Sequence, residues 1–85
     1  MLIQLQFLNY LLESRDSSVL MLNNIDDTFF SDYKEEYNFI REHLSNYNVV
    51  PDKITFASKF KDFDFIEVKE SSNFLVEELY KDKNV

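Results

Sequence analysis

The chain has 85 residues, no cysteine and no glycine, and 45% of its residues are hydrophobic. This length corresponds to one small domain with enough apolar side chains for a core. The lack of cysteine excludes disulfides, thiolate metal sites and a cysteine nucleophile. The lack of glycine excludes the Walker A loop and the dinucleotide-binding fingerprint, because both need glycine where the backbone approaches phosphate.

The formal net charge is −7, from 16 acidic and 9 basic residues. Nucleic-acid affinity comes mainly from lysine and arginine that release counterions from phosphates, so direct binding to nucleic acid is not expected. The acidic residues are spread along the chain, which is typical of a solvated surface and also suits a basic protein partner. The apolar residues 2–12 are too few to span a membrane, which needs about 20, and they lack the basic start of a signal peptide. We therefore expect a cytoplasmic protein that contacts no membrane.

Hydrophobic residues at helical spacing predict five helices. The expected helices cover residues 2–13, 18–23, 32–47 and 53–61, and a last one runs from residue 71 or 72 to residue 81. No repeat or long linker divides them, so residues 1–85 are expected to form a single all-α domain. Residues 82–85 are expected to form a frayed tail. Residues 62–68, which alternate phenylalanine with acidic residues, are left without an assigned structure.

Each expected helix has an apolar face that we assign to the core, because spacings of three and four residues are what a core-facing helix requires. Phe29 or Phe30, in the connector before the longest helix, is expected to fill the core as well. The inward faces are Leu5, Leu8, Leu11 and Leu12; then Val19, Leu20 and Leu22; then Tyr33, Tyr37, Ile40, Leu44 and Tyr47; then Ile54, Ala57 and Phe60; and finally Leu75, Val76 and Leu79.

Polar residues mark the ends of these helices. A serine or aspartate before a helix can accept a hydrogen bond from its first free amides, and asparagine tolerates the left-handed conformation that closes a helix. The expected N-caps are Asp16 or Ser17, Ser31, Asp52, and Ser71 or Ser72. The expected C-terminal stops are Asn23 with Asn24, and Asn46 with Asn48 before Pro51.

Side chains that could carry chemistry are few. The only histidine, His43, is two residues from Ser45, which places the two on different faces of one helix. The acidic groups have neither the glycine-centred loop of a calcium site nor the Glu-x-x-His motif of a carboxylate-bridged metal pair. We therefore expect no catalytic, cofactor or metal site. The acidic groups considered are Asp32 with Glu35 and Glu36, and Asp62 with Asp64.

Several aromatic residues lie off the predicted core faces, and an 85-residue domain cannot bury all of them. Clustered exposed aromatics mark protein-docking patches. The aromatics in question are Tyr10, Phe39, Phe56, Phe74 and Tyr80.

Four short motifs follow one another along the chain. They are a leucine-rich run at residues 7–12 (FLNYLL), an acidic-aromatic turn at residues 27–30 (DTFF), a Val-Pro-Asp turn at residues 50–52 and the pair Phe74-Leu75. In this order they resemble the N-terminal domain of hexameric replicative DNA helicases of the DnaB type, particularly the divergent versions of phages and mobile elements. The chain departs from that pattern at Asn9, where many members have glycine, and at Ser71-Ser72, where many have Gly-Gly, which indicates a distant branch.

The resemblance implies a small orthogonal helical bundle that forms a non-catalytic collar on the helicase ring. Such a domain supports ring assembly and docks primase or a helicase loader during DNA replication, which raises the partner's local concentration. ATP and Mg²⁺ would belong to a separate motor domain. The family's dimerising helical hairpin is expected to be missing, so we expect a monomer or weak dimer in isolation and a hexamer within a full helicase. By resemblance, we assign the partner contact to Phe74 and Tyr80, because the last helix leads toward that hairpin.

Three other functions are considered. A free-standing adaptor or inhibitor would act on a replisome protein without a helicase motor of its own. An acidic DNA mimic would need carboxylates spaced like phosphates on one face, whereas here they are scattered. A small enzyme is disfavoured, because glycine motifs, cysteine and a partner for His43 are lacking.

Overall fold

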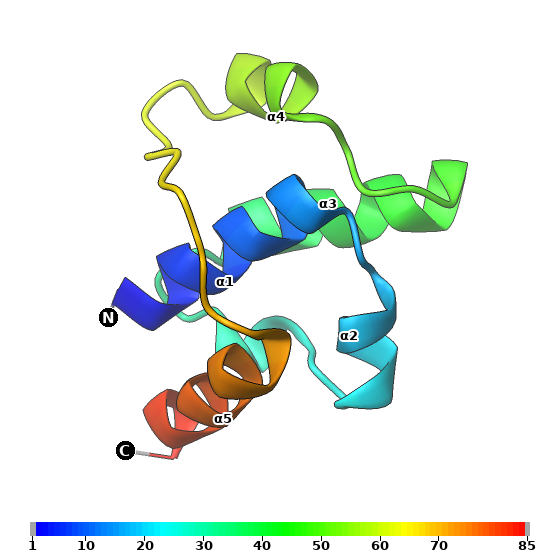
Figure 1. Cartoon of the computed structure of the whole chain (residues 1–85). Helices are drawn as coiled ribbons and strands as arrows, with labels where there is room; N and C mark the ends of the chain where they lie inside the picture. The colour runs from blue at the N-terminus through cyan, green and yellow to red at the C-terminus, as the bar shows by residue number, and fades with distance from the viewer. Residues whose placement is uncertain (1, 85) are drawn as a thin grey trace.

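The computed structural model describes residues 2–84 and shows a small all-α bundle (Figure 1). No strand occurs among these residues, and the Cα radius of gyration is 11.8 Å. The elements are α1 (Leu2–Ser14), α2 (Ser18–Leu22), the 3-10 helix η1 (Asp27–Phe29), α3 (Lys34–Tyr47), α4 (Lys53–Lys59) and α5 (Ser72–Lys83). The predicted all-α fold with five α helices is therefore confirmed.

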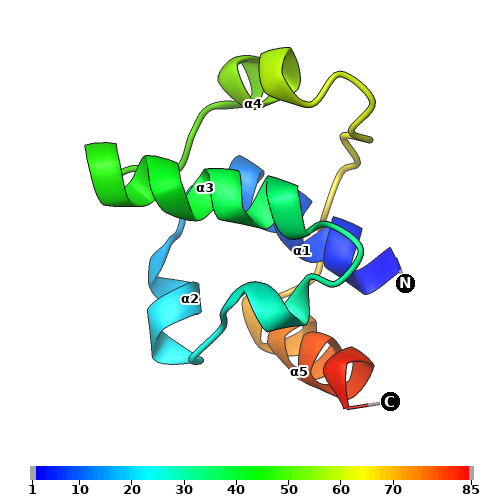
Figure 2. The ribbon, with the colours of Figure 1, turned by 180° about the vertical axis from the view of Figure 1, so that it is seen from behind.

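Helix α1 lies at the centre of the bundle. Seen from the front, the segment that joins α4 to α5 crosses α1 on the near side, with α4 above and α5 below (Figure 1). Seen from behind, α3 covers the opposite side of α1 (Figure 2). Because α1 is enclosed in this way, it is apolar around most of its circumference, as expected for a central helix. Its buried residues are Ile3, Gln4, Leu5, Phe7, Leu8, Asn9, Leu11 and Leu12.

Aromatic rings fill the space between α1, η1 and α3. Phe30 stacks on Tyr37 with ring centroids 4.4 Å apart and lies 6.0 Å from Phe7. Both Phe29 and Phe30 are buried, whereas only one of them was predicted to fill the core. The Tyr37 hydroxyl donates a hydrogen bond to the Ile25 carbonyl at 3.1 Å, and burial raises the pKa of Tyr37 to about 12. Phe30 thus links α3 to α1.

Three of the residues assigned to the core are exposed. Leu22 is 79% exposed, because the left-handed Asn24 (φ 52°) reverses the chain just after α2 and places Ile25 in the core instead. Ile54 is 82% exposed and Tyr47 is 67% exposed. Tyr47 belongs to the last turn of α3, which extends past the other helices (Figure 1).

The fourth helix buries a different face from the one predicted. Phe56 is fully buried, and Ile54, two residues earlier, lies about 200° away around the helix and points outward. Ala57 and Phe60 are only half-buried. Helix α4 also ends at Lys59, two residues before its predicted end at Lys61.

Most of the predicted helix ends are confirmed. Asp52 accepts a hydrogen bond from the Thr55 amide at 2.9 Å, and Ser71 accepts one from the Phe74 amide at 3.3 Å. At the other end of a helix, Asn48 adopts φ 62° and closes α3, as a left-handed C-terminal residue does. These caps are local interactions, which is why sequence spacing alone predicts them.

The start of the longest helix was predicted incorrectly. Ser31 does not cap it, and α3 begins at Lys34 rather than at Asp32. The buried side-chain amide of Gln4 forms hydrogen bonds with both residues. Its Nε2 donates to the Ser31 hydroxyl at 3.3 Å, and its Oε1 accepts from the Asp32 amide at 2.9 Å. Because Gln4 already satisfies these groups, the chain remains irregular until residue 34.

The last helix is longer than predicted. Helix α5 continues to Lys83, so residues 82 and 83 are helical and do not belong to a frayed tail. The carboxylate of Asp82 accepts a hydrogen bond from Gln4 Nε2 at 3.0 Å, which ties this end of α5 to α1. Val85, the last residue of the expected tail, lies outside the described residues.

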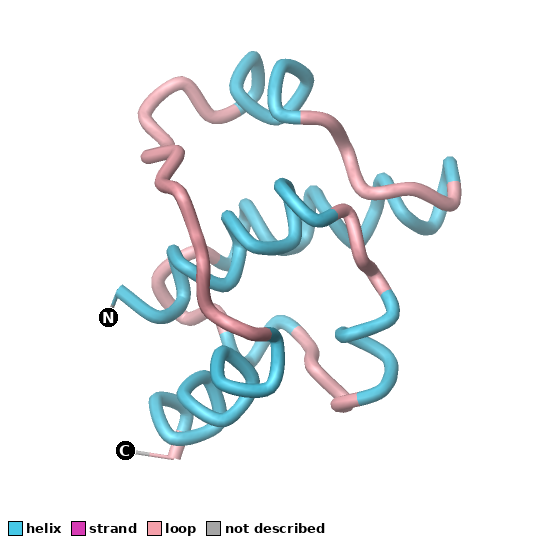
Figure 3. Tube along the Cα trace, in the orientation of Figure 1, coloured by secondary structure: helices cyan, strands magenta, loops and turns pink. Residues whose placement is uncertain are grey.

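The segment between α4 and α5 has no regular secondary structure and runs beside α1 (Figure 3). It is held by Asn9, whose Nδ2 donates to the Asp64 carbonyl and whose Oδ1 accepts from the Ile66 amide, both at 3.0 Å. Phe63 and Phe65 pack against Phe56, with ring centroids 4.8 and 6.2 Å away. One buried polar side chain and an aromatic cluster thus position this stretch without a strand partner.

Candidate docking surfaces

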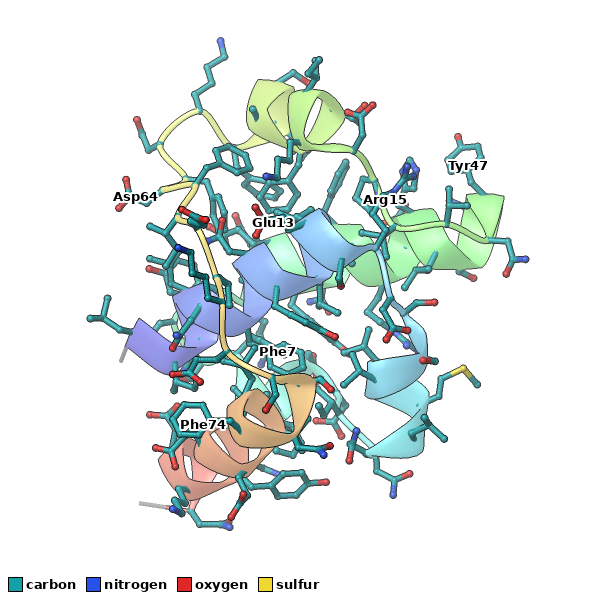
Figure 4. All side chains as sticks on the ribbon, viewed as in Figure 1. Phe7, Glu13, Arg15, Tyr47, Asp64 and Phe74 are labelled. Carbon is teal, nitrogen blue, oxygen red and sulfur yellow. The ribbon has the colours of Figure 1, made fainter. Side chains whose placement is uncertain are left out.

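Phe74 and Tyr80, the predicted docking residues, both reach the surface of α5, with exposed fractions of 42% and 36%. They are six residues apart, which places them about 120° apart around the helix. The structure therefore does not bring them together on one face. Phe74 lies on the first turn of α5 and reaches solvent (Figure 4).

Tyr80 has a structural role that the sequence did not reveal. Its ring packs edge-on against Phe29, with centroids 4.8 Å apart, and its hydroxyl donates a hydrogen bond to the carbonyl of Asn23. The amino group of Lys83 lies 4.4 Å from the centroid of the same Phe29 ring. Tyr80 thus joins α5 to η1 and to the end of α2.

The remaining off-face aromatics do not form a separate exposed patch. Tyr10 and Phe39 are half-buried, and Phe56 is the centre of an aromatic cluster rather than a surface residue. The prediction that Phe56 belongs to a docking patch is wrong, because the ring faces α3 and the 62–68 segment. The rings within 6.2 Å of Phe56 are those of Phe39, Phe60, Phe63 and Phe65.

A groove of about 380 Å³ opens between the C-terminal half of α3 and the start of α4. Its aromatic wall is a stripe on α3, in which the His43 ring lies 4.7 Å from Tyr47 and 6.3 Å from Phe39. The residues that line it are Phe39, Glu42, His43, Asn46, Tyr47 and Thr55. A second hollow of about 360 Å³ continues along the same two helices and is lined by Glu35, Asn38, Phe39, Glu42, Lys59 and Phe60. We call these two hollows together the α3–α4 groove.

Charges border the α3–α4 groove unevenly. Glu35 and Glu42 stand on the α3 side, and within residues 2–84 neither forms an ion pair. Lys59 stands on the α4 side. The other lysine of α4, Lys53, is engaged elsewhere, because its amino group lies 3.5 Å from the carboxylate of Glu13.

His43 and Ser45 occupy different grooves, as their spacing predicts. His43 lines the α3–α4 groove, whereas Ser45 faces α2 beside Met21. Among the described residues, no group of three or more histidine, cysteine, aspartate or glutamate side chains is arranged to hold a metal ion. None of the described helices combines the length and apolar character needed to cross a membrane.

No protein-family model, no curated protein sequence and no solved structure significantly matches this chain.

Proposed function

We propose that this chain is a non-catalytic docking domain of the kind found at the N-terminus of DnaB-type replicative helicases, acting in the cytoplasm. The observation that carries the docking role is an apolar side chain presented to solvent by a firmly anchored helix. Phe74 is 42% exposed, while its neighbour Leu75 and Leu79 one turn later are fully buried. Aromatic anchors on ordered elements dominate protein interfaces, because they bury a large area with little loss of conformational freedom.

The helicase assignment rests on the order of the four motifs along the chain. Residues at the two places where the chain departs from the family pattern have local structural roles. Asn9, in the place of a glycine, supplies the hydrogen bonds that hold residues 64–66, and Ser71, in the place of a second glycine, caps α5. Both substitutions are therefore compatible with a helical bundle that lacks glycine.

The mechanism we propose is tethering. The domain would hold primase or a helicase loader beside the ring, so that the partner's effective concentration near the unwound strand is raised without any chemical step in this domain. Neighbouring helicase subunits would be its other partners. ATP and Mg²⁺ would act in a separate motor domain.

The test is a pull-down from lysate of the source cell, with the purified domain as bait and mass spectrometry as the readout. We expect primase or a loader to be retained, and we expect Phe74→Ala to abolish retention. Leu22→Ala is the matched control, because Leu22 is exposed on α2 and lies outside the proposed contact. Failure to retain either protein, or retention that survives Phe74→Ala, would contradict the proposal. Retention of some other replisome protein, with neither primase, a loader nor a helicase subunit, would favour the alternative adaptor or inhibitor.

A further inference from the structure

We propose that the α3–α4 groove is a second docking site and that it binds a basic amphipathic helix of a partner protein. Neither the groove nor its occupant follows from the helicase resemblance, which places the partner contact on α5. The inference rests on the shape of the groove, on its charges and on the contacts that hold it open.

The shape fits a helix. Phe39, His43 and Tyr47 recur every four residues, so they form one stripe along α3 over about 12 Å. A partner helix with apolar residues at spacings of three and four presents a stripe of the same length, which is the usual helix-in-groove mode. Tyr47 is 67% exposed and makes a ring contact only with His43 among the described residues, so it is free to cover an incoming side chain.

The charge selects a basic partner. The carboxylates of Glu35 and Glu42 border the groove on the α3 side, and neither forms an ion pair within residues 2–84. A lysine or arginine on one flank of the partner helix would complement them. A second copy of this chain is disfavoured as the occupant, because each copy carries a formal net charge of −7. Lys59 lies on the opposite rim and would repel the basic flank of the partner helix. The partner helix is therefore expected to bind with its basic flank facing α3.

The groove is held open by contacts on both sides. The Phe39 ring packs against Phe56 of α4 and against Phe60, which directly follows α4, with ring centroids 6.0 and 5.6 Å away. The connector between α3 and α4 is held at the end of α1, where the Arg15 guanidinium donates to the Val50 carbonyl at 2.7 Å (Figure 4). A preformed site loses less freedom when it binds, which favours affinity.

The groove is separate from the Phe74 surface. Figure 4 shows Tyr47 at the far end of α3 and Phe74 on α5, on opposite sides of the molecule. A variant of one surface therefore leaves the other intact, and failure of one proposal is distinguishable from failure of the other.

The experiment uses the whole chain and a fluorescein-labelled synthetic helix of about 14 residues, matching α3 in length. The helix carries leucine on one face and lysine on the flanks. A charge-reversed peptide with glutamate in place of lysine and a scrambled lysine peptide are the comparisons. Fluorescence anisotropy at about 0.05 and 0.3 M salt measures affinity, and amide chemical shifts of the isotope-labelled protein map the site.

We expect the lysine helix to bind at least about tenfold more tightly than the other two peptides, with weaker binding at high salt. Tyr47→Ala should weaken binding about tenfold, and Glu42→Lys about fivefold. Lys59→Glu should not weaken it. Leu22→Ala and Phe74→Ala, both outside the groove, should leave it unchanged. Circular dichroism checks that each variant is folded, which the exposure of Tyr47 favours.

Three results would overturn the proposal. The first is equal binding of the lysine and glutamate helices, or no binding of the lysine helix. The second is a folded Tyr47→Ala variant with unchanged affinity. The third is a set of shifts centred on α2 or α5 rather than on the α3–α4 groove.

Discussion

The side-chain oxygen of Asn9 accepts a hydrogen bond at 3.0 Å from the backbone amide of Ile66, which lies 57 residues further along the chain. The same side chain donates to the Asp64 carbonyl at 3.0 Å and to the Leu5 carbonyl within α1, also at 3.0 Å. Asn9 is 1% exposed, so its end of these bonds lies away from water. A single buried amide therefore fastens the irregular segment before α5 to the central helix.

Asn9→Ala should lower the free energy of unfolding by about 2 kcal/mol, because it leaves backbone groups of residues 64 and 66 without their buried partner. Urea denaturation would measure this loss, and hydrogen exchange at the Ile66 amide should become faster. Asn38→Ala, at an exposed position of α3, is the matched control and should change stability by less than about 0.5 kcal/mol. Equal stability of the two variants would show that Asn9 does not hold the segment.

Ser71→Ala should destabilise the protein by about 1 kcal/mol, since the Phe74 amide loses its hydrogen-bond acceptor at the start of α5. Ser17→Ala provides the comparison. Ser17 occupies the same position before α2, but its side chain forms no cap hydrogen bond, so a much smaller change is expected. Thermal unfolding of both variants side by side is the measurement, and a larger loss for Ser17→Ala would contradict this reading of the caps.

Acid should destabilise the fold in part through two aspartates. The hydrogen bond from the Thr55 amide lowers the pKa of Asp52, and hydrogen bonds from the Thr28 hydroxyl and amide lower that of Asp26. A folded-state pKa below the ordinary value of 3.8 means that each group stabilises the protein above that pH. This stability is lost as the pH falls through the lower folded-state value.

Asp52→Asn tests this pH dependence, because asparagine can accept the same cap hydrogen bond but does not titrate. Urea midpoints measured from neutral pH down to the acid transition should fall less steeply for the variant than for the parent protein. An unchanged slope would show that Asp52 does not contribute.

Alkali should act through Tyr37. Burial raises its pKa from 10.0 to about 12, so the folded state keeps a proton that the unfolded chain releases. The stabilisation is complete below pH 10 and is lost as the pH rises through about 12. Tyrosinate absorbance should show one late-titrating group, and Tyr37→Phe should remove it. If that late titration persists in the variant, another tyrosine is responsible.

Tyr80→Phe should lower stability by about 0.5–1 kcal/mol, because it removes the hydrogen bond to Asn23 but keeps the ring contact with Phe29. Tyr80→Ala should cost more, since it removes both. Chemical denaturation of the two variants separates the contributions of the hydroxyl and the ring. Equal stabilities would show that the ring contact contributes nothing.

Sequence spacing predicted the features of this chain that depend on near neighbours. Asp52 and Ser71 cap their helices because each accepts a hydrogen bond from an amide three residues away. Asn24 and Asn48 adopt the left-handed conformation because asparagine tolerates it better than most residues. Start and stop signals of this range can be read without knowing the fold.

Ser31 shows where prediction from local sequence spacing fails. Ser31 looks like a cap in sequence, but the amide of Gln4, which is 27 residues away, binds it and the neighbouring Asp32 backbone. Nothing near residue 31 signals that competitor. Long-range hydrogen bonds from buried amides therefore account for the error at the start of α3.

The candidate docking surfaces were likewise predicted only in part from the sequence. Phe74 and Tyr80 are aromatics that the sequence predicts to be exposed, and both reach solvent, but only the structure shows that Tyr80 packs against Phe29. The α3–α4 groove was not predicted. Tyr47 has the spacing of a core residue, and the only signal for the groove would have been the recurrence of Phe39, His43 and Tyr47 every four residues.

By itself, the sequence determined an all-α chain, most of the helix boundaries and the exclusion of cysteine- and glycine-dependent sites, because these follow from composition and local spacing. The tertiary structure decided which apolar side chains face water. On a helix as short as α4, inward faces centred on Ile54 or on Phe56 satisfy the local pattern almost equally well. Packing against α3 and the 62–68 segment selects Phe56, since those neighbours lie outside α4 and contact it only in the folded chain.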